Sequence, residues 1–352
     1  MLKFSEIRAC SQRVPDDPHH FPSEVFRLIT EQRLLYINLS GEFRKEAFPI
    51  SVFQALFEIG KAGLPAGRIY EGHINGLELI KAYGSSSQKD FYFREAINGK
   101  LFSVWNTEMN SEAVTAERIK SQVHLNGAKT FCSGGLGIDY ALITAKMDGG
   151  KQLLIIPLKE YKQLEEDCSL WQPMGMKNSV SCRIDFSGIA IPPKNLLGSL
   201  NDYEQEPWFS GGAMRFAAVQ LGGAEAVMIA GLEHLKKQNR TADPYQQQRM
   251  GTMAVQIQSG KFWLEKAQDI YDNEDKYTSG EIINFGNMMR SVVLEISENI
   301  LHLTERSVGV QGFMENHPLE RLYRDLKVYL KQPGPDLALQ NVGSFTFEHY
   351  NL

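Results

Sequence analysis

The chain has 352 residues, of which 43% are hydrophobic, and its formal net charge is -5. This length suffices for two or three packed units, and acidic and basic residues alternate without forming the basic stripe that a nucleic-acid backbone requires. No run of about 18 uncharged apolar residues occurs, and residues 1–20 lack the apolar core of a signal peptide. We therefore expect a cytoplasmic protein that binds neither nucleic acid nor membranes. The four cysteines are scattered, which predicts reduced thiols rather than a disulfide framework.

The first hundred residues have a helical pattern. In residues 21–40, apolar side chains recur at helical spacing at Val25, Ile29, Leu34 and Ile37, which predicts a first helix. Residues 47–65 predict a second helix that ends at Gly63 and Pro65, and residues 74–84 predict a third.

Near residue 100 the pattern changes to short apolar or alternating segments separated by Gly, Asn and Asp. These segments are 101–108, 118–127, 139–146, 151–158 and 182–191. They predict an antiparallel β domain. Long helices do not alternate with them, which argues against a doubly wound parallel sheet.

From Gly211 onward the chain again has a helical pattern. Three long segments, 211–239, 244–272 and 279–307, are followed by two shorter ones, 317–331 and 335–347. Long helices joined by short Gly- or Pro-containing links usually pack as antiparallel neighbours, which predicts a four-helix bundle. The expected fold class is α+β, with an N-terminal helical domain (1–99), a central antiparallel β domain (100–205) and a C-terminal four-helix bundle (206–352).

Four segments carry functional groups in a characteristic order. They are Val104–Glu108, Lys129–Gly135, Met174–Ser179 with Ile191–Gly198, and Arg306–Phe313 with Pro318–Asp325. Their order and spacing resemble the acyl-CoA dehydrogenase superfamily over roughly residues 100–335. The resemblance implies the same three-part fold, a bound FAD, a homodimer or homotetramer, and a small-molecule or thioester substrate carried by CoA or a carrier protein.

In the β domain the resemblance implies four cofactor-binding residues. Trp105 and Thr107 would lie beside the flavin ring, because a threonine hydroxyl can hydrogen-bond its polar edge. Phe131 would cover one edge of the flavin, and the Ser133 hydroxyl would donate to its N5 atom. The alternative without a cofactor is a strand end at Thr107 and a β-hairpin with Phe131 in its core.

At the C-terminal end the resemblance implies a site for the FAD pyrophosphate of a neighbouring subunit. Arg240 and Arg306 would contact the phosphates, and the turn at Gly309 and Val310 would allow close backbone approach. Asp243 stands where the family usually has Phe. Alternatively, both arginines stabilise helix C-termini through the helix dipole.

The carboxylate that removes the substrate α-proton in most of the superfamily is missing. Pro333-Gly334 stands where the family has Glu-Gly, and residues 210–215, where some relatives carry the base, contain no acid. Asp336 and Glu108 are the only weak candidates, so the catalytic residue is unknown. The histidines lack metal-ligand spacing, and we expect no metal site.

The sequence leaves three functions open. The first is an FAD-dependent dehydrogenase that oxidises an acyl thioester or related substrate with hydride transfer to flavin N5. The second is a flavin-dependent monooxygenase of the same fold, which needs no α-proton base. The third is a flavin-binding protein without turnover. Met109–Glu112 replaces the family's Gly/Ser-rich loop at the substrate phosphate, so a substrate other than a CoA thioester fits the sequence as well.

Overall fold

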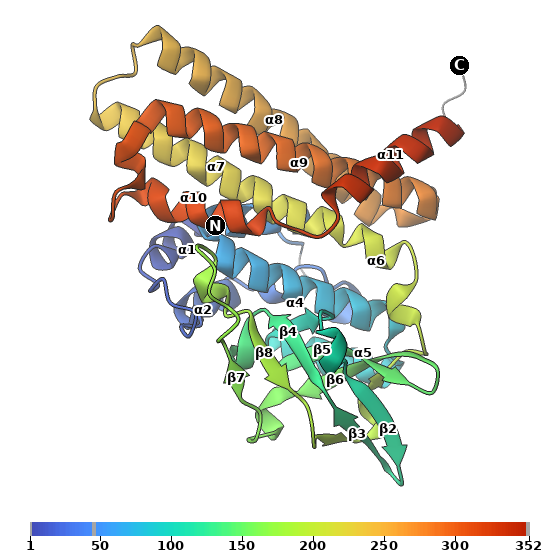
Figure 1. Cartoon of the computed structure of the whole chain (residues 1–352). Helices are drawn as coiled ribbons and strands as arrows, with labels where there is room; N and C mark the ends of the chain where they lie inside the picture. Colours follow the sequence, from blue (N-terminus) through green and yellow to red (C-terminus); the bar gives the residue numbers. More distant parts are fainter. Residues whose placement is uncertain (1, 44–46, 350–352) are drawn as a thin grey trace. The chain divides into compact units, whose positions relative to one another are not determined.

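The computed structural model describes residues 2–43 and 47–349, and Figure 1 shows their helices and strands. The chain forms two compact units. The first, called the β-sheet unit below, consists of Met1–Pro49, Arg68–Gln172 and Lys177–Phe209. The second, the bundle unit, consists of Ile50–Gly67, Pro173–Met176 and Ser210–Leu352. The N-terminal helices are divided between these units, and the boundaries 1–99, 100–205 and 206–352 stay a prediction.

The first predicted helix is interrupted. Helix α1 (Phe4–Ser11) is followed by α2 (Ser23–Glu31), which ends before Arg33 because this residue has a left-handed φ of 61°. A short 3-10 turn, η1 (Leu34–Tyr36), continues the chain. The four apolar residues at helical spacing are nevertheless all buried, at 0–1% exposure. Their spacing therefore identified core residues correctly, although one helix does not hold them all.

Helix α3 (Val52–Ala62) ends at Gly63, as predicted. Pro65, however, begins a helix instead of ending one, because the first turn of a helix needs no hydrogen bond from its N–H groups. The resulting α4 (Leu64–Tyr83) starts ten residues before the predicted 74–84. Helix α5 (Ser86–Ile97) was not predicted; a capping box formed by Ser85 and Gln88 starts it.

Two sheets form the β part of the β-sheet unit. The strands are β1 (Phe102–Trp105), β2 (Thr115–Ile119), β3 (Gln122–Asn126), β4 (Ala128–Cys132), β5 (Tyr140–Met147), β6 (Gly150–Pro157), β7 (Glu166–Asp167), β8 (Cys182–Asp185), β9 (Ala190–Ile191) and β10 (Leu196–Leu197). The larger sheet has the order β10-β6-β5-β2-β3-β9, with β1 also paired to β5, and the smaller has the order β4-β8-β7. Pairing is antiparallel as predicted, except that β1 and β2 run parallel to β5.

An aromatic cluster anchors β1 in this unit. The Phe102 ring stacks on Tyr140 with centroids 5.0 Å apart and meets Tyr92 of α5 edge-on at 6.1 Å. Phe102 is fully buried. Burying a side chain of this size stabilises the fold by about 1.5–3 kcal/mol, and it fixes the strand whose end carries Trp105.

The bundle unit contains the predicted long helices. They are α7 (Ala213–Lys237), α8 (Pro244–Asp272), α9 (Ser279–Val308), α10 (Pro318–Tyr329) and α11 (Pro335–His349), and the short α6 (Trp208–Gly211) precedes them. Helix α7 packs against α3, α8, α9 and α10. At Gly222 a Cβ atom would collide with the Phe57 carbonyl of α3, so glycine is what permits this close approach.

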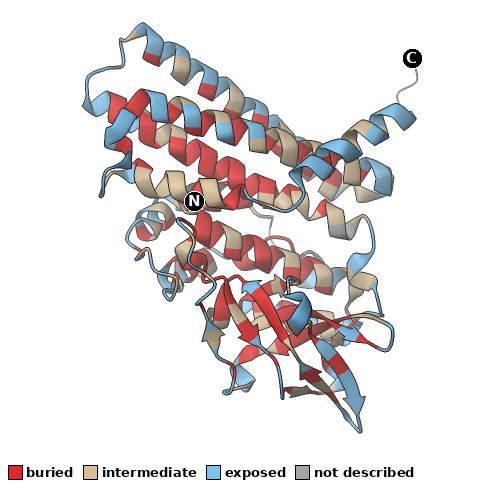
Figure 2. Ribbon diagram, viewed as in Figure 1, coloured by how far each residue is buried: buried red, intermediate tan, exposed pale blue. Residues whose placement is uncertain are grey.

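Helix α7 is the one helix of the described residues long and apolar enough, by length and composition, to cross a membrane. Of its most apolar 18-residue stretch, 72% is buried inside the protein, as is usual for a core helix. Figure 2 shows the same burial along α7 in red. Arg215 and Glu225 lie in this helix, in agreement with the absence of a long uncharged run.

One prediction about the cysteines is wrong. Cys168 and Cys182 form a disulfide with a Cα–Cα distance of 4.4 Å, whereas Cys10 and Cys132 are free and buried. The reason is strand register: β7 pairs with β8 so that Asp167 opposes Arg183. Cys168, the residue directly after β7, therefore faces Cys182. Two cysteines that look scattered in the sequence are neighbours across this antiparallel pair.

Candidate functional site

The end of β1 is bonded to the chain just after β4. The Trp105 side chain is buried, and its Nε1 donates to the Ser133 carbonyl at 3.1 Å. The Ser103 hydroxyl donates to the same carbonyl, also at 3.1 Å. Thr107 is exposed, and its carbonyl accepts from the Thr130 N–H at 2.8 Å. Three of the predicted cofactor residues, Trp105, Thr107 and Ser133, therefore lie along two connected chain segments.

Phe131 is an exposed aromatic residue in a strained conformation. It is 55% exposed, and its φ of 54° lies in the left-handed region. For a bulky residue this is a rare conformation that costs of order 1–3 kcal/mol. The edge of Trp171 meets its ring with centroids 6.1 Å apart. The alternative of a hairpin with Phe131 in its core is wrong, because β4 pairs with β8 and the ring faces outward.

The Ser133 hydroxyl belongs to a buried chain of three serine hydroxyls. Ser133 Oγ lies 2.9 Å from Ser181 Oγ, which lies 2.8 Å from Ser179 Oγ. Three hydroxyls carry three protons and make two bonds among themselves, so one proton is left over, and the directions of the two bonds decide which hydroxyl keeps it. When Ser179 and Ser181 donate along the chain, the Ser133 hydroxyl is free to donate to a ligand. Ser181 lay outside the residues that sequence reasoning assigned to the site.

Glu108, one of the two weak candidates for a catalytic base, is bound in a polar network. Lys129 is fully buried, and its Nζ lies 2.5 Å from Glu108 Oε2 and 3.0 Å from Thr144 Oγ1. Burial lowers the pKa of Lys129, and the bond to Glu108 acts in the opposite direction. Glu108 also accepts from the Val114 N–H at 3.3 Å. This carboxylate therefore neutralises a buried ammonium group, which sequence reasoning did not anticipate.

The loop after Glu108 stands where the family has a Gly/Ser-rich loop. It forms a 3-10 turn, η3 (Asn110–Glu112). Arg183 Nε lies 2.8 Å from Glu112 Oε2, and Arg183 also pairs with Asp185 at 3.0 Å. The loop thus presents a carboxylate that is held in place by a guanidinium.

In the bundle unit, the two predicted phosphate-binding arginines belong to one cluster. Arg240 pairs with Asp243, which caps the start of α8. With its amide oriented to satisfy its neighbours, Gln246 accepts from Arg240 at 3.0 Å and from Arg249 at 3.3 Å. Arg249 in turn donates to the Arg306 carbonyl at 3.0 Å. Gln246 and Arg249 were missed because nothing in their local sequence distinguishes them from other polar residues on a helix.

Arg306 and the turn after it leave hydrogen-bond donors unused. Within residues 2–43 and 47–349, no carboxylate pairs with the Arg306 guanidinium, which is exposed in the last turn of α9. Gly309 follows with a φ of 72°, and a Cβ added there would meet nothing within 4 Å. Val310 is 72% exposed. An open, basic turn of this kind offers an anion both guanidinium groups and an approachable backbone.

The segment that would hold the family's catalytic carboxylate links α10 to α11. Pro333 accepts at its carbonyl from Arg290 Nη2 of α9, at 2.5 Å. Gly334 has a φ of 62°. Asp336, the second weak candidate for the base, lies exposed in the first turn of α11. Sequence reasoning did not single out Arg290.

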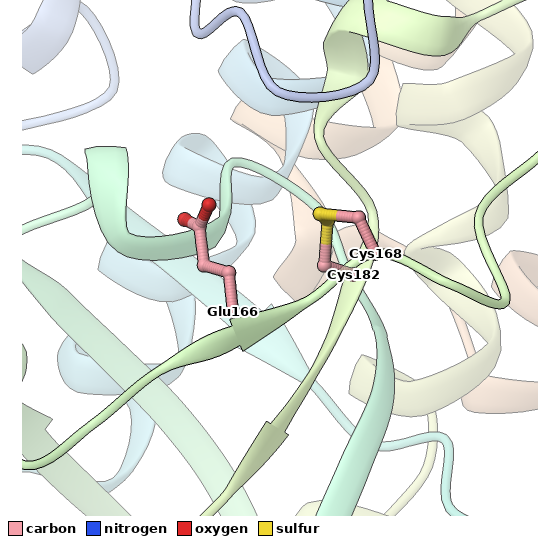
Figure 3. A group of neighbouring side chains, drawn as sticks. All are labelled: Glu166, Cys168 and Cys182. Atoms are coloured by element: carbon pink, nitrogen blue, oxygen red, sulfur yellow. A yellow bond between two sulfur atoms is a disulfide. The ribbon is translucent and has the colours of Figure 1, made fainter.

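Glu166, Cys168 and Cys182 gather in a group that resembles a metal site, with potential ligand atoms within 4.8 Å of one another (Figure 3). The two sulfur atoms are bonded to each other, so neither is a thiolate that could bind a metal. The Glu166 carboxylate points away from the disulfide in Figure 3 and accepts from the Leu136 N–H. This group therefore supports the fold.

Comparison with known proteins finds relatives that align with most of the chain. Residues 205–336 match the family described as "Acyl-CoA dehydrogenase, C-terminal domain". A dibenzothiophene monooxygenase of Rhodococcus erythropolis is 23% identical over 333 residues, covering 84% of this chain and 79% of the relative. An acryloyl-CoA reductase (NADH) of Anaerotignum propionicum is 25% identical over 337 residues, with 89% and 83% covered. A 3-(aryl)acrylate reductase of Clostridium sporogenes is 24% identical over 360 residues, with 96% and 93% covered.

Solved structures show the same fold. The dibenzothiophene monooxygenase TdsC of Paenibacillus sp. A11-2, in complex with FMN and indole, superposes with a TM-score of 0.87 at 19% identity, covering 98% of this chain and 95% of that one. Butyryl-CoA dehydrogenase of Megasphaera elsdenii gives a TM-score of 0.82 at 17% identity, with 98% and 97% covered. The chain is a member of the acyl-CoA dehydrogenase superfamily, and the predicted α+β fold is confirmed.

Proposed function

We propose that the protein is a flavin-dependent oxidoreductase. The observation that carries this proposal is the pairing of an exposed, strained Phe131 with a buried Ser133 hydroxyl, which is free to donate to a ligand when Ser181 donates to it. Phe131 would cover an edge of the flavin ring, and Ser133 would donate to N5. A bound flavin supplies a two-electron acceptor and donor at that atom. Trp105 and Thr107 would complete this part of the site.

FAD, rather than FMN, is the cofactor that we propose. Two of the solved relatives, TdsC and KijD3, hold FMN, which has a single phosphate. The cluster of Arg240, Arg249 and Arg306 beside the open turn at Gly309 offers donors that a pyrophosphate would use. If the FAD belongs to a neighbouring copy, as the resemblance implies, the functional unit is at least a dimer.

Heat release of the bound cofactor followed by chromatography tests this assignment. We expect FAD and a protein at least dimeric by light scattering. Recovery of FMN, or no flavin binding in a micromolar titration, would overturn the FAD assignment. A stable monomer saturated with FAD would refute the shared site while leaving the cofactor itself intact.

The reaction that we favour is a monooxygenation of a small substrate, because it needs no base to remove an α-proton. Such a base must lie close to the substrate and away from water, and it contributes about 10²–10⁴-fold to the rate. Pro333 stands at the family's position, Glu108 is bound to Lys129, and Asp336 is exposed to solvent. The resemblance to dibenzothiophene monooxygenases supports the same choice.

Anaerobic mixing with butyryl-CoA and octanoyl-CoA tests this choice. We expect the flavin absorbance to stay unbleached over minutes, whereas chemically reduced protein reoxidises in air. Transfer of an isotopically labelled oxygen atom from O₂ into a product would establish the monooxygenase. Reoxidation without any product from a broad substrate panel would leave a flavin-binding protein without turnover.

Dehydrogenation of an acyl thioester, with hydride transfer to N5, is the second candidate. The acryloyl-CoA reductase relative favours it, since that name implies hydride exchange with an acyl thioester. Rapid bleaching by either CoA ester with formation of the enoyl product would select this reaction. Asp336→Asn and Glu108→Gln would then identify which carboxylate serves as the base.

A further inference from the structure

The conformation of Phe131 has to be held by its neighbours. A bulky residue rarely adopts a left-handed φ, and it keeps one only where the surrounding structure enforces it. Phe131 has a φ of 54°, and the pairing of β4 with β8 shifts register between Lys129 and Cys132. At this irregularity Phe131 is 55% exposed. The hydrophobic core therefore holds little of its side chain.

Trp171 is an aromatic neighbour of this ring. The two ring centroids are 6.1 Å apart and the ring planes stand at 85°, which is the edge-to-face arrangement that aromatic pairs favour. Both residues belong to the β-sheet unit, Phe131 in β4 and Trp171 in the loop that follows β7. Trp171 is only half-buried, so the pair adds little to the core. Its geometry instead fixes a direction for the exposed Phe131 ring.

Trp171 is itself held at its backbone and at its indole ring. Its backbone N–H donates to the Cys168 carbonyl at 3.0 Å, and its Nε1 donates to the Lys177 carbonyl at 3.0 Å. The disulfide ties Cys168 to Cys182, which lies opposite the residue that follows Phe131 in β4. The support of Phe131 thus begins and ends in the paired strands β4 and β8, and a covalent bond closes it.

We propose that Trp171 is a positioning residue of the flavin site: it holds the Phe131 ring in the orientation in which this ring covers the edge of the flavin. A ring that is already held in its bound orientation loses less conformational freedom when the flavin binds. This inference rests on the proposed flavin-dependent function and adds a residue to its site. Trp171 lies in none of the four segments whose order resembles the family.

Hydrogen exchange of the apoprotein tests the support without any cofactor, when mass spectrometry follows the peptide that contains Phe131. In Trp171→Ala this peptide should exchange at least about threefold faster than in the wild type. Trp171→Phe keeps an aromatic edge and loses only the bond to the Lys177 carbonyl, so its exchange should stay near that of the wild type. If Trp171→Ala does not fold, Trp171→Leu replaces it, because leucine fills part of the same volume without an aromatic ring.

Titration of the same apoproteins with FAD, and in parallel with FMN, tests the consequence for the cofactor. The energy of an edge-to-face pair corresponds to a change of about three- to tenfold in a binding constant. We expect Trp171→Ala to bind flavin more weakly by this factor. The visible circular dichroism of the bound flavin should change as well, because it reports on the surroundings of the ring. Trp171→Phe should restore both the affinity and the spectrum.

Trp263→Ala is the matched control. Trp263 is also half-buried, and its ring centroid lies 5.2 Å from that of Phe285 in the bundle unit. The variant therefore removes an indole of the same size from another aromatic pair. It should leave the exchange at Phe131, the flavin affinity and the spectrum unchanged. Equal losses in Trp263→Ala and Trp171→Ala would reflect general destabilisation and would overturn the positioning role.

Unchanged exchange at Phe131 in Trp171→Ala would overturn the inference, and so would faster exchange with unchanged flavin affinity and spectrum. In either case Trp171 would be a neighbour of Phe131 that does not act on the flavin. A wild type that takes up neither FAD nor FMN refutes the proposed function, whatever the exchange at Phe131 shows. Flavin bound equally by the wild type and by Trp171→Ala refutes this inference alone, so the two failures are distinguishable.

Discussion

The β-sheet unit and the bundle unit treat their polar groups differently. In the β-sheet unit, the Lys129 ammonium is neutralised by Glu108, and the Ser133 hydroxyl bonds to that of Ser181, which in turn bonds to that of Ser179. In the bundle unit, the guanidinium groups of Arg306 and Arg290 have no carboxylate partner within the described residues. A network whose charges and hydrogen-bond groups are all paired within the protein makes the fold rigid, whereas an unpaired cation can bind an anion. Mutation of Lys129 should therefore act on stability, and mutation of Arg306 on ligand binding.

The largest effect is expected for Lys129→Met. The substitution removes the ammonium from a buried network and leaves Glu108 without its partner, which should cost about 3–5 kcal/mol of unfolding free energy. Urea denaturation measures it. The double variant with Glu108→Gln removes both charges and should recover part of the loss. A single variant as stable as the wild type would show that this network does not support the unit.

The second-largest effect on stability is expected for loss of the disulfide. Cys168 and Cys182 are separated by 14 residues, and closing a loop of this size stabilises a fold by about 3 kcal/mol. The variant with both cysteines replaced by serine should lose roughly that amount. It should also be insensitive to dithiothreitol, whereas the wild type should fall to a similar stability when reduced. Equal stability of both forms, with four titratable thiols in the denatured, unreduced wild type instead of the two of Cys10 and Cys132, would contradict the pairing.

Acid should destabilise the β-sheet unit through His73. This ring is fully buried, accepts from the Phe102 N–H at Nδ1, and burial lowers its pKa from 6.5 to about 4. The unfolded chain then binds the proton more readily than the folded one between these values. Stability is therefore complete above pH 6.5 and falls by roughly 3 kcal/mol as the pH decreases towards 4.

Denaturation at a series of pH values checks this expectation against His73→Asn, which should flatten the slope in this range. In the bundle unit, burial also lowers the pKa of His234 and of His317, whose ring nitrogens lie 3.1 Å apart. They act with the same sign, so part of the slope should survive the substitution. A variant with the full wild-type slope would exclude His73 as its source.

The smallest effect concerns Arg306, and here stability should not change. Arg306→Ala should weaken FAD binding by about 1.5–3 kcal/mol, because hydrogen bonds to a charged phosphate are lost. Fluorescence titration of the apoprotein with FAD measures the affinity, and thermal unfolding of the apoprotein should be unaffected. Lys276→Ala is the control for loss of charge. Unchanged FAD affinity would leave Arg306 with the role of stabilising the end of α9.

Most helices could be predicted because their limits are set by local signals. Gly63 ends α3, and Pro244 and Pro318 start α8 and α10 at positions where a proline is tolerated. Errors arose where one residue type can either begin or end a helix, or where nothing in the sequence marks a break. Pro65 begins a helix although it was expected to end one, and the break at Arg33 depends on a backbone conformation that its side chain does not announce.

The candidate site was predicted in part. Its sequence-predicted members, such as Phe131, Ser133 and Arg306, lie in short segments whose spacing resembles the family. The roles of Lys129, Ser181 and Arg249 were missed, because each depends on a hydrogen-bond partner that is distant in sequence and adjacent only in the folded chain. The assignment of cofactor-binding residues itself stays a prediction.

The sequence by itself determined the order of helical, β and helical segments, the core positions and the absence of a carboxylate at Pro333, because periodicity, turn residues and residue identity are local properties. Tertiary structure alone decided which groups neutralise one another. The register of β7 and β8 joined Cys168 to Cys182, and the meeting of α9 with the α10–α11 link gave Arg290 a carbonyl instead of an acid. Charge pairing and burial depend on neighbours that are distant in sequence, so they follow only from the folded chain.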